Sequence, residues 1–201
     1  MKKIPTIFKR NPEKPQELLQ EWLPDCLWVR DGEGTATRKW DGTCCMIKDG
    51  VLYKRRELKP GTDVPRGQLP GWIFAGVDEN TGKVVGWVAV GEGKEDQWHR
   101  EAFSTHPIPP VEDGTYELVG PKVQGNPEEF ADHCLVRHGR FPMCSDLVRS
   151  FEGIRDHLAT QNIEGLVFHH PDGRMAKIKK KDYGLPRKPL AFNWMDLVEV
   201  E

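Results

Sequence analysis

Apolar and polar residues alternate along much of the chain, which predicts a protein built mainly from β-strands. Val85, Trp87 and Ala89 give the clearest example, since every second residue is apolar, as in a strand with one buried face. Asp49-Gly50 lies between two such runs and is a typical hairpin dipeptide. The expected strands, in chain order, are an extended run over 27–39, then 43–47, 51–53, 71–77, 83–90, 114–120, 163–169 and 174–179.

Three segments have helical spacing instead. A short amphipathic helix is expected after Pro15, with its apolar residues continuing to Trp22, and a second helix over 94–103. Ser145 is expected to cap a third helix. Its apolar face would consist of Leu147, Val148, Phe151, Ile154 and Leu158. Hairpins interleaved with helices predict an α+β fold with mainly antiparallel sheets and flanking helices.

Length and composition point to one globular domain over residues 1–201, with 37% hydrophobic and 30% charged residues. No apolar run approaches the roughly 20 residues that span a bilayer, and the basic N-terminus lacks an apolar signal core, so we expect a cytoplasmic protein that does not bind membranes. The five cysteines are odd in number and lack CxxC spacing, which favours reduced thiols. The alternative is a zinc site built from Cys134, Cys144, His133 or His138.

The net charge of −2 does not by itself indicate a nucleic-acid-binding protein. The charge is unevenly distributed, however, because residues 174–188 contain seven basic residues and one acidic residue. Such a segment could bind phosphates, or it could be a lysine-rich hairpin exposed to solvent.

One motif carries candidate chemistry: residues 38–45 read Arg-Lys-Trp-Asp-Gly-Thr-Cys-Cys and contain Lys-x-Asp-Gly. A lysine in this setting can attack the α-phosphate of a nucleotide if nearby cations favour its neutral form. Three further segments follow in order, namely Thr115–Gly120, Glu164–Phe168 and Ala176–Lys179. They supply the cations Lys177 and Lys179 and the carboxylates Glu117 and Glu164, which suit Mg²⁺. Gly42 and Gly165 would let the backbone approach the nucleotide.

Each feature also has an ordinary interpretation. A lysine before Asp-Gly is usually a turn residue, Glu117 could face solvent, and alternating lysines usually mark an exposed edge. The occurrence of all four segments in this order favours the functional interpretation.

The series resembles motifs I, III, IV and V of polynucleotide ligases and capping enzymes, which are covalent nucleotidyltransferases. The string from Lys39 to Cys45 resembles small ATP-dependent RNA ligases, a group that includes the vertebrate 5′ to 3′ RNA ligases. The resemblance implies that Lys39 forms a lysyl-AMP adduct and that Lys177 and Lys179 contact the α-phosphate and assist the departure of pyrophosphate. It gives Glu117 and Glu164 the acidic roles of motifs III and IV. Glu164 suits the metal ion, and Glu117 suits either the ribose hydroxyls or a second metal ion. The nucleotide-binding residues that it implies are Thr37, Arg38, Lys39, Gly42, Arg55, Arg56, Glu117, Glu164, Lys177 and Lys179, with Arg55 and Arg56 as alternatives for one role.

The resemblance implies a nucleotidyltransferase (ligase adenylation) fold. We expect no OB domain, because 38 residues precede Lys39 and 22 follow Lys179. The implied reaction is ATP-dependent RNA ligation of 5′-phosphate and 3′-hydroxyl ends with Mg²⁺, or Mn²⁺ in its place, and without an obligate protein partner. A DNA nick ligase, a GTP-using capping-type enzyme and a non-catalytic RNA-end binding module are the alternatives. Phe130 and Phe141 are both candidates for stacking on adenine, although core packing suits each.

Overall fold

The computed structural model describes residues 3–61, 72–78, 81–105, 107–108, 112–143 and 146–188. Within it the chain forms two compact units, each made of two separate stretches. Unit 1 consists of residues 1–4 and 40–141, and unit 2 consists of residues 5–39 and 142–201.

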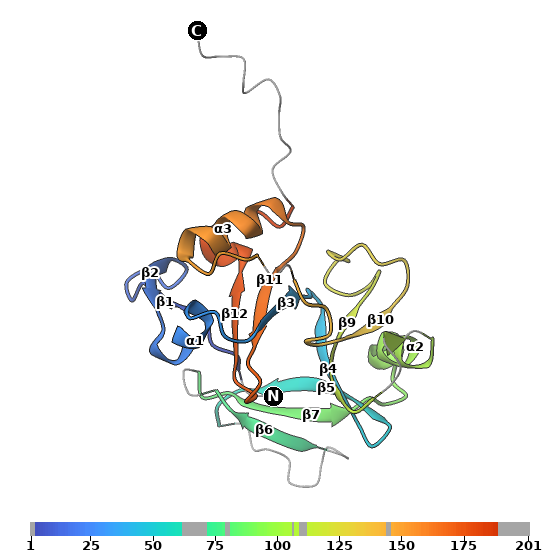
Figure 1. The fold of residues 1–201 in the computed structure, drawn as a ribbon. Helices are drawn as coiled ribbons and strands as arrows, with labels where there is room; N and C mark the ends of the chain where they lie inside the picture. Colours follow the sequence, from blue (N-terminus) through green and yellow to red (C-terminus); the bar gives the residue numbers. More distant parts are fainter. Residues whose placement is uncertain are drawn as a thin grey trace. The chain divides into compact units, whose positions relative to one another are not determined.

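Unit 2 contains a small hairpin, a three-stranded antiparallel sheet and helix α3 (Figure 1). Its elements are β1 (Phe8–Arg10), β2 (Leu18–Trp22), the 3-10 helix η1 (Pro24–Cys26), α1 (Leu27–Arg30), β3 (Thr35–Lys39), α3 (Phe151–Thr160), β11 (Gly165–His169), β12 (Met175–Lys179) and the 3-10 helix η3 (Lys180–Tyr183).

The three-stranded sheet has the order β12-β11-β3, so β11 pairs with a neighbour on each side. One face of the sheet carries side chains that α3 covers, and this face forms the core of the unit. Its buried residues include Leu166, Phe168 and Ile178 from the sheet, together with Ile154 and Leu158 from α3. The opposite face is therefore the one left for polar side chains.

Unit 1 is built on a seven-stranded sheet with the order β6-β7-β5-β4-β9-β10-β8, in which only the β10–β8 pair is parallel. Its elements are β4 (Thr43–Lys48), β5 (Val51–Leu58), β6 (Ile73–Val77), β7 (Val84–Ala89), the 3-10 helix η2 (Lys94–Asp96), α2 (Gln97–Thr105), β8 (Pro107–Ile108), β9 (Gly114–Val119) and β10 (Cys134–Arg137).

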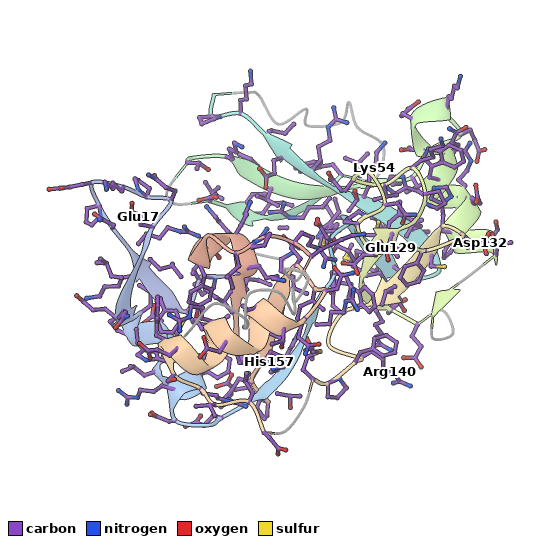
Figure 2. All side chains as sticks on the ribbon, turned by 90° about the horizontal axis from the view of Figure 1, so that it is seen from above. Glu17, Lys54, Glu129, Asp132, Arg140 and His157 are labelled. Atoms are coloured by element: carbon purple, nitrogen blue, oxygen red, sulfur yellow. The ribbon has the colours of Figure 1, made fainter. Side chains whose placement is uncertain are left out.

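Strand alternation sorts the residues of this sheet onto two faces. One face carries the larger core, including Cys45, Tyr116 and Leu118, against which α2 packs through Ala102 and Phe103. Lys54, labelled in Figure 2, lies on this face and forms an ion pair with Asp96 of η2. The carboxylate of Asp96 also accepts a hydrogen bond from the Gly91 backbone N–H at 2.8 Å, so it fixes the start of the helical segment.

The antiparallel α+β prediction is confirmed, and the hairpins are found where the sequence predicts them. Asp49 and Gly50 have φ values of 52° and 73°, the paired positive values that a two-residue type I′ turn requires. The strands on either side of this turn, β4 and β5, pair antiparallel. The predicted helix over 94–103 is also confirmed as η2 followed by α2.

The helix predicted after Pro15 is wrong, because Leu18–Trp22 forms strand β2. Glu17 closes a turn by donating its backbone N–H to the Lys14 carbonyl at 2.8 Å. After this turn the chain returns as β2, which pairs antiparallel with β1. Leu18 and Trp22 still pack on the core of unit 2. The apolar spacing alone did not distinguish the two structures, because a helix this short gains little stability from its own hydrogen bonds.

Several boundaries also differ from the predictions, and the strand expected over 51–53 continues to Leu58 as β5. Residues Leu27–Arg30, expected to be extended, form the short helix α1. Helix α3 begins at Phe151 and is capped by Ser150, whose side chain accepts the Gly153 backbone N–H at 2.9 Å. Val148, expected on the apolar face, lies before this helix and is 65% exposed. The predicted cap, Ser145, lies outside the described residues.

Among the residues that the structure describes, no helix combines the length and apolar character that crossing a membrane requires.

Candidate active site

Two lysines and a carboxylate meet on the polar face of the three-stranded sheet in unit 2. Gly165, at the start of β11, is in register with Lys39 of β3 on one side and Lys179 of β12 on the other. Residues in register point to the same face of a sheet, so the two lysines flank a position without a side chain. Glu164 directly precedes that position.

Glu164 binds both lysines. One carboxylate oxygen forms an ion pair with Lys39 Nζ, and the other lies 2.5 Å from Lys179 Nζ. The Glu164 side chain is only 13% exposed. Burial alone would raise the pKa of Glu164, but the ammonium groups of Lys39 and Lys179 more than compensate and lower it below the ordinary value. The carboxylate is therefore ionised and neutralises part of a compact positive charge.

Gly165 is required by the backbone packing. A Cβ atom at this position would lie 2.1 Å from the Ile178 carbonyl oxygen and 2.8 Å from the Lys179 Cα. Any side chain would push β12 away and with it Lys179. The sequence assigned Gly165 to close approach by a nucleotide, and the structure gives it a second reason, the close approach of the neighbouring strand.

Thr37 and Arg38 lie on opposite faces of β3, because neighbouring residues of a strand alternate. Thr37 shares the face of Lys39 and is 2% exposed, and its hydroxyl donates to the Val167 carbonyl at 3.1 Å. Arg38 lies on the other face and donates to the Asn162 carbonyl at 3.3 Å. The structure thus brings only Thr37 to the side of the sheet that carries Lys39.

The basic segment 174–188 divides into groups with different roles. Lys177 shares the face of Lys179, two residues along β12. Lys180 is 2% exposed and donates to the carbonyls of Gln161 at 2.7 Å and Arg187 at 3.0 Å, so it is a structural residue that cannot bind phosphate. Asp182, the one acid of the segment, accepts the Lys179 backbone N–H at 3.0 Å and fixes the end of β12.

A second polar group lies in unit 1 around Glu117 of β9. One carboxylate oxygen, Oε1, accepts the Gly42 backbone N–H at 3.2 Å, and Oε2 lies 2.9 Å from His138 Nε2. Glu117 is in register with Cys44 of β4, so Cys44 shares its face. A Cβ on Gly42 would lie 2.1 Å from the Leu118 carbonyl oxygen. Glycine is therefore needed at position 42 because the turn packs closely against β9.

Strand register also separates Arg55 from Arg56, which the sequence could not do. Cys45 is in register with both Lys54 and Tyr116, so Lys54 and Arg56 lie on the core face of the large sheet. Arg55 lies on the other face, the face of Glu117. Its guanidinium forms an ion pair with Glu57 at 2.7 Å.

Trp40 lies between the two candidate aromatic residues. Its ring contacts Phe130 edge-on at a centroid distance of 5.9 Å and Phe141 at 6.1 Å. Phe130 joins Trp40 in packing on the buried patch formed by Val119, Cys134 and Val136, whereas Phe141 is 40% exposed. Of the two rings, Phe141 is therefore the more exposed, since Phe130 is partly buried.

Sequence reasoning missed the combination of Cys44 and His138 with Glu117. Among the described residues, these three form the one group of at least three His, Cys, Asp or Glu side chains close enough to hold a single metal ion. His138 was considered for a zinc site with cysteines from its own neighbourhood, but its partners come from two other strands. Only the register of β4, β9 and β10 reveals this grouping.

Comparison with known proteins gives a consistent result. RNA ligase 1 from Rattus norvegicus is 24% identical over 75% of this chain and 67% of that protein. RNA ligase 1 from Pongo abelii is 29% identical over 74% and 67%, respectively. RNA ligase 1 from Danio rerio is 29% identical over 96% of this chain and 84% of that protein.

The family model of RNA ligase 1 matches residues 65–195, well over half of the 201-residue chain. The matched stretch includes Glu117, Glu164, Lys177 and Lys179 and begins after Lys39. The chain therefore belongs to the RNA ligase 1 family.

Proposed function

We propose that this protein is an ATP-dependent RNA ligase that works through a covalent lysyl-AMP intermediate on Lys39. Membership of the RNA ligase 1 family supports RNA ligase activity. The observation that carries the finer proposal is the pair of lysines, Lys39 and Lys179, held against one carboxylate across Gly165. We also propose that the chain has a nucleotidyltransferase fold and that the protein acts in the cytoplasm.

The reaction has three steps. Lys39 Nζ attacks the α-phosphorus of ATP, a phosphoramidate bond forms, and pyrophosphate leaves. A 5′-phosphate oxygen of RNA then attacks the same phosphorus, which frees Lys39 and leaves AMP on the RNA end. Finally an RNA 3′-hydroxyl attacks the 5′-phosphate, the phosphodiester forms, and AMP leaves.

The contacts of Lys39 and Lys179 with Glu164 fit the state of the enzyme before it reacts with ATP. Lys39 must attack as a neutral amine, but in the structure its Nζ is engaged in an ion pair with Glu164. Glu164 must therefore exchange Lys39 for another cation before the first step. Lys179, and Lys177 on the same face, would stay to contact the phosphate, where fixed positive charge stabilises the transferring group.

Mg²⁺ fits the carboxylate of Glu164, because hard cations prefer oxygen ligands and keep several waters. When bound, Mg²⁺ would neutralise phosphate charge, and Mn²⁺ could replace it. Glu117 is a poorer match for Mg²⁺, since a thiol and an imidazole lie beside it. Its proposed partners are the ribose hydroxyls or a second metal ion, and Thr37, Arg38, Gly42 and Arg55 or Arg56 complete the proposed nucleotide-binding set.

Incubation with ATP labelled at the α-phosphate, followed by a denaturing gel, tests the first step. Wild type should retain the label and Lys39→Ala should not. Lys181→Ala, which removes an exposed lysine of the same basic segment, is the matched control and should be labelled like wild type. Labelling of Lys39→Ala at the wild-type level would contradict the mechanism.

Reactions with other nucleotides and nucleic acids distinguish this proposal from the alternative functions. Labelled GTP in place of ATP distinguishes a capping-type enzyme, and nicked DNA in place of RNA with 5′-phosphate and 3′-hydroxyl ends distinguishes a DNA ligase. We expect ATP and RNA to be preferred. Wild type that binds RNA but takes no label from either nucleotide, after pyrophosphate has removed any bound AMP, would instead be an RNA-end binding module.

A further inference from the structure

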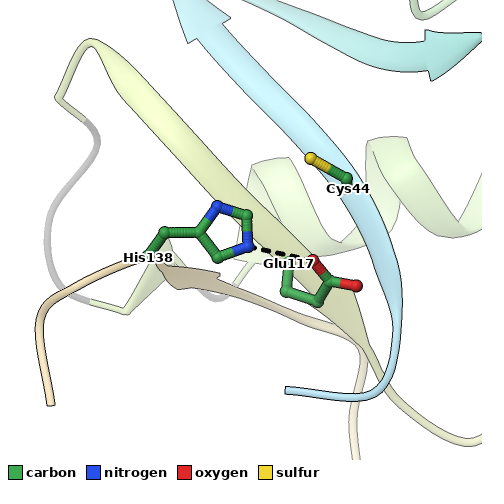
Figure 3. A group of neighbouring side chains, drawn as sticks. All are labelled: Cys44, Glu117 and His138. Carbon is green, nitrogen blue, oxygen red and sulfur yellow. Dashed lines mark hydrogen bonds and ion pairs between the residues drawn. The ribbon is translucent and has the colours of Figure 1, made fainter. Parts of the chain in front are cut away.

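The side chains of Cys44, Glu117 and His138 converge on one face of the large sheet of unit 1 (Figure 3). They come from three neighbouring strands, since Cys44 lies on β4, Glu117 on β9, and His138 directly after β10. Their sulfur, oxygen and nitrogen ligand atoms all lie within 4.8 Å of one another. We propose that they form a binding site for Zn²⁺ or a similar borderline-soft divalent ion, distinct from any Mg²⁺ that accompanies ATP.

The donor set selects the metal. A thiolate and an imidazole are ligands that Zn²⁺ and Co²⁺ prefer, whereas Mg²⁺ prefers oxygen atoms and water. Three protein ligands with a fourth position left to water or another molecule is a common arrangement for zinc. Ligand atoms around tetrahedral zinc lie about 3.5 Å apart, so small side-chain rotations would bring all three onto one ion.

Two hydrogen bonds already orient the ligands. The Thr115 hydroxyl lies 3.0 Å from His138 Nδ1, so in the metal-bound state Nδ1–H would donate to it and the Nε2 lone pair, which now faces Glu117, would bind the ion. The Gly42 N–H holds Glu117 Oε1, whereas Oε2 lies 2.9 Å from His138 Nε2, so an ion would bind by replacing this contact between the two side chains. Such supporting contacts fix the orientation of metal ligands in many proteins.

Of the two adjacent cysteines, Cys44 and Cys45, Cys44 is the one whose side chain lies on the face of Glu117 and His138. Cys45 points to the opposite face of the sheet, where it is fully buried in the core, and burial raises the pKa of its thiol well above the ordinary value. Cys44 and His138 are partly exposed, while Glu117 is buried. An ion therefore has access from solvent to the two softer ligands, and its binding would release the Cys44 proton to the buffer.

Titration of untagged, chelator-treated protein with Co²⁺ tests the proposal without any ligase reaction. Thiolate-to-cobalt absorption should appear and saturate at one equivalent. Zn²⁺ should abolish it, and Mg²⁺ in large excess should not. Cys44→Ser should lose this absorption, and His138→Gln should weaken Co²⁺ binding at least tenfold. Cys134→Ser changes a cysteine of β10 that lies outside the group, and this variant should behave like wild type.

A second measurement uses wild type alone, so the test does not depend on a variant that folds. Zn²⁺ should slow the alkylation of Cys44 by iodoacetamide at least tenfold, as read by peptide mass spectrometry, and Mg²⁺ should not. The proposal fails if folded wild type shows no thiolate absorption with Co²⁺, if the absorption survives in Cys44→Ser, or if Zn²⁺ leaves the alkylation of Cys44 unchanged. Any of these results would leave Glu117 and His138 as a structural hydrogen-bonded pair.

Discussion

Glu164 is the residue that compensates the charges of two lysines, which lie on either side of Gly165. Lys39 and Lys179 have side chains only 19% and 22% exposed, so water screens their mutual repulsion only in part. The carboxylate between them supplies the compensating charge. Its removal should therefore affect the stability of the fold as well as the proposed chemistry.

We expect Glu164→Gln to lower the free energy of unfolding by about 2 kcal/mol, because two partly buried ammonium groups lose a charged hydrogen-bond partner. Urea unfolding at pH 7 measures this change. Glu21→Gln, in the exposed ion pair with Lys9, makes the same substitution on the surface of unit 2 and should cost under about 1 kcal/mol. Equal losses in the two variants would contradict the expectation.

The same carboxylate predicts how the stability of the folded protein depends on pH. Since the pKa of Glu164 is lowered from its ordinary value of 4.5, its stabilising effect is present above pH 4.5 and is lost as the pH falls through the lower folded value. Wild type and Glu164→Gln should therefore converge in stability at strongly acid pH. A gap between them that widens on acidification would have the wrong sign.

His157 of α3, labelled in Figure 2, predicts a dependence in a different range of pH. Burial lowers the pKa of His157 below 6.5, so the unfolded chain takes up a proton before the folded protein does. Stability should fall as the pH drops from 7 to 5, by at most about 1.4 kcal/mol per pH unit for this residue. His157→Gln should give a shallower slope in urea unfolding, and an unchanged slope would contradict the assignment.

At the scale of elements, the sequence predicted what depends on neighbours along the chain and missed what depends on register. The hairpin over 163–179 predicted that Glu164 and Lys179 meet, because its strands are joined by a short turn. Strand β2 was predicted as a helix, because its partner β1 is too short and irregular to recognise. The grouping of Cys44 with His138 could not be predicted, since it depends on how three separate strands align.

Gly165→Ala should be one of the most destabilising small substitutions in the chain. The new methyl group would overlap the Ile178 carbonyl, so we expect a loss of about 3 kcal/mol or failure to fold. Gly91→Ala is the matched control, since its Cβ would meet its nearest atom at an ordinary 3.6 Å. Thermal unfolding of both variants gives the comparison, and tolerance of Gly165→Ala would show that β11 and β12 lie farther apart than described.

At the scale of the whole molecule, neither unit is one continuous stretch of chain. Unit 2 contains residues 5–39 and 142–201, so the chain passes between the units at several points. Lys39 is the last residue before one of these passages, and Trp40 is the first after it. Such interleaving favours the single domain that the sequence predicts. Because each unit is made of two stretches joined through the other unit, unfolding one unit frees the ends of both stretches of the other.

This prediction can be tested with one leucine from each unit. Leu158→Ala in unit 2 and Leu118→Ala in unit 1 each remove a buried side chain and should cost about 3 kcal/mol. For a single domain, each should shift one shared urea transition, seen alike by circular dichroism and tryptophan fluorescence. Two transitions, each moved by one variant only, would mean two domains.

The buried Lys180 has a practical consequence for recombinant expression. Its ammonium group joins the end of α3 to the chain at residue 187, because it binds the carbonyls of Gln161 and Arg187. A gene shortened before codon 187 would therefore remove one of these two anchors and leave a positive charge inside the protein with too few acceptors. Truncated versions made for crystallisation should keep residue 187, and amine-directed crosslinkers should label Lys181 while leaving Lys180 untouched.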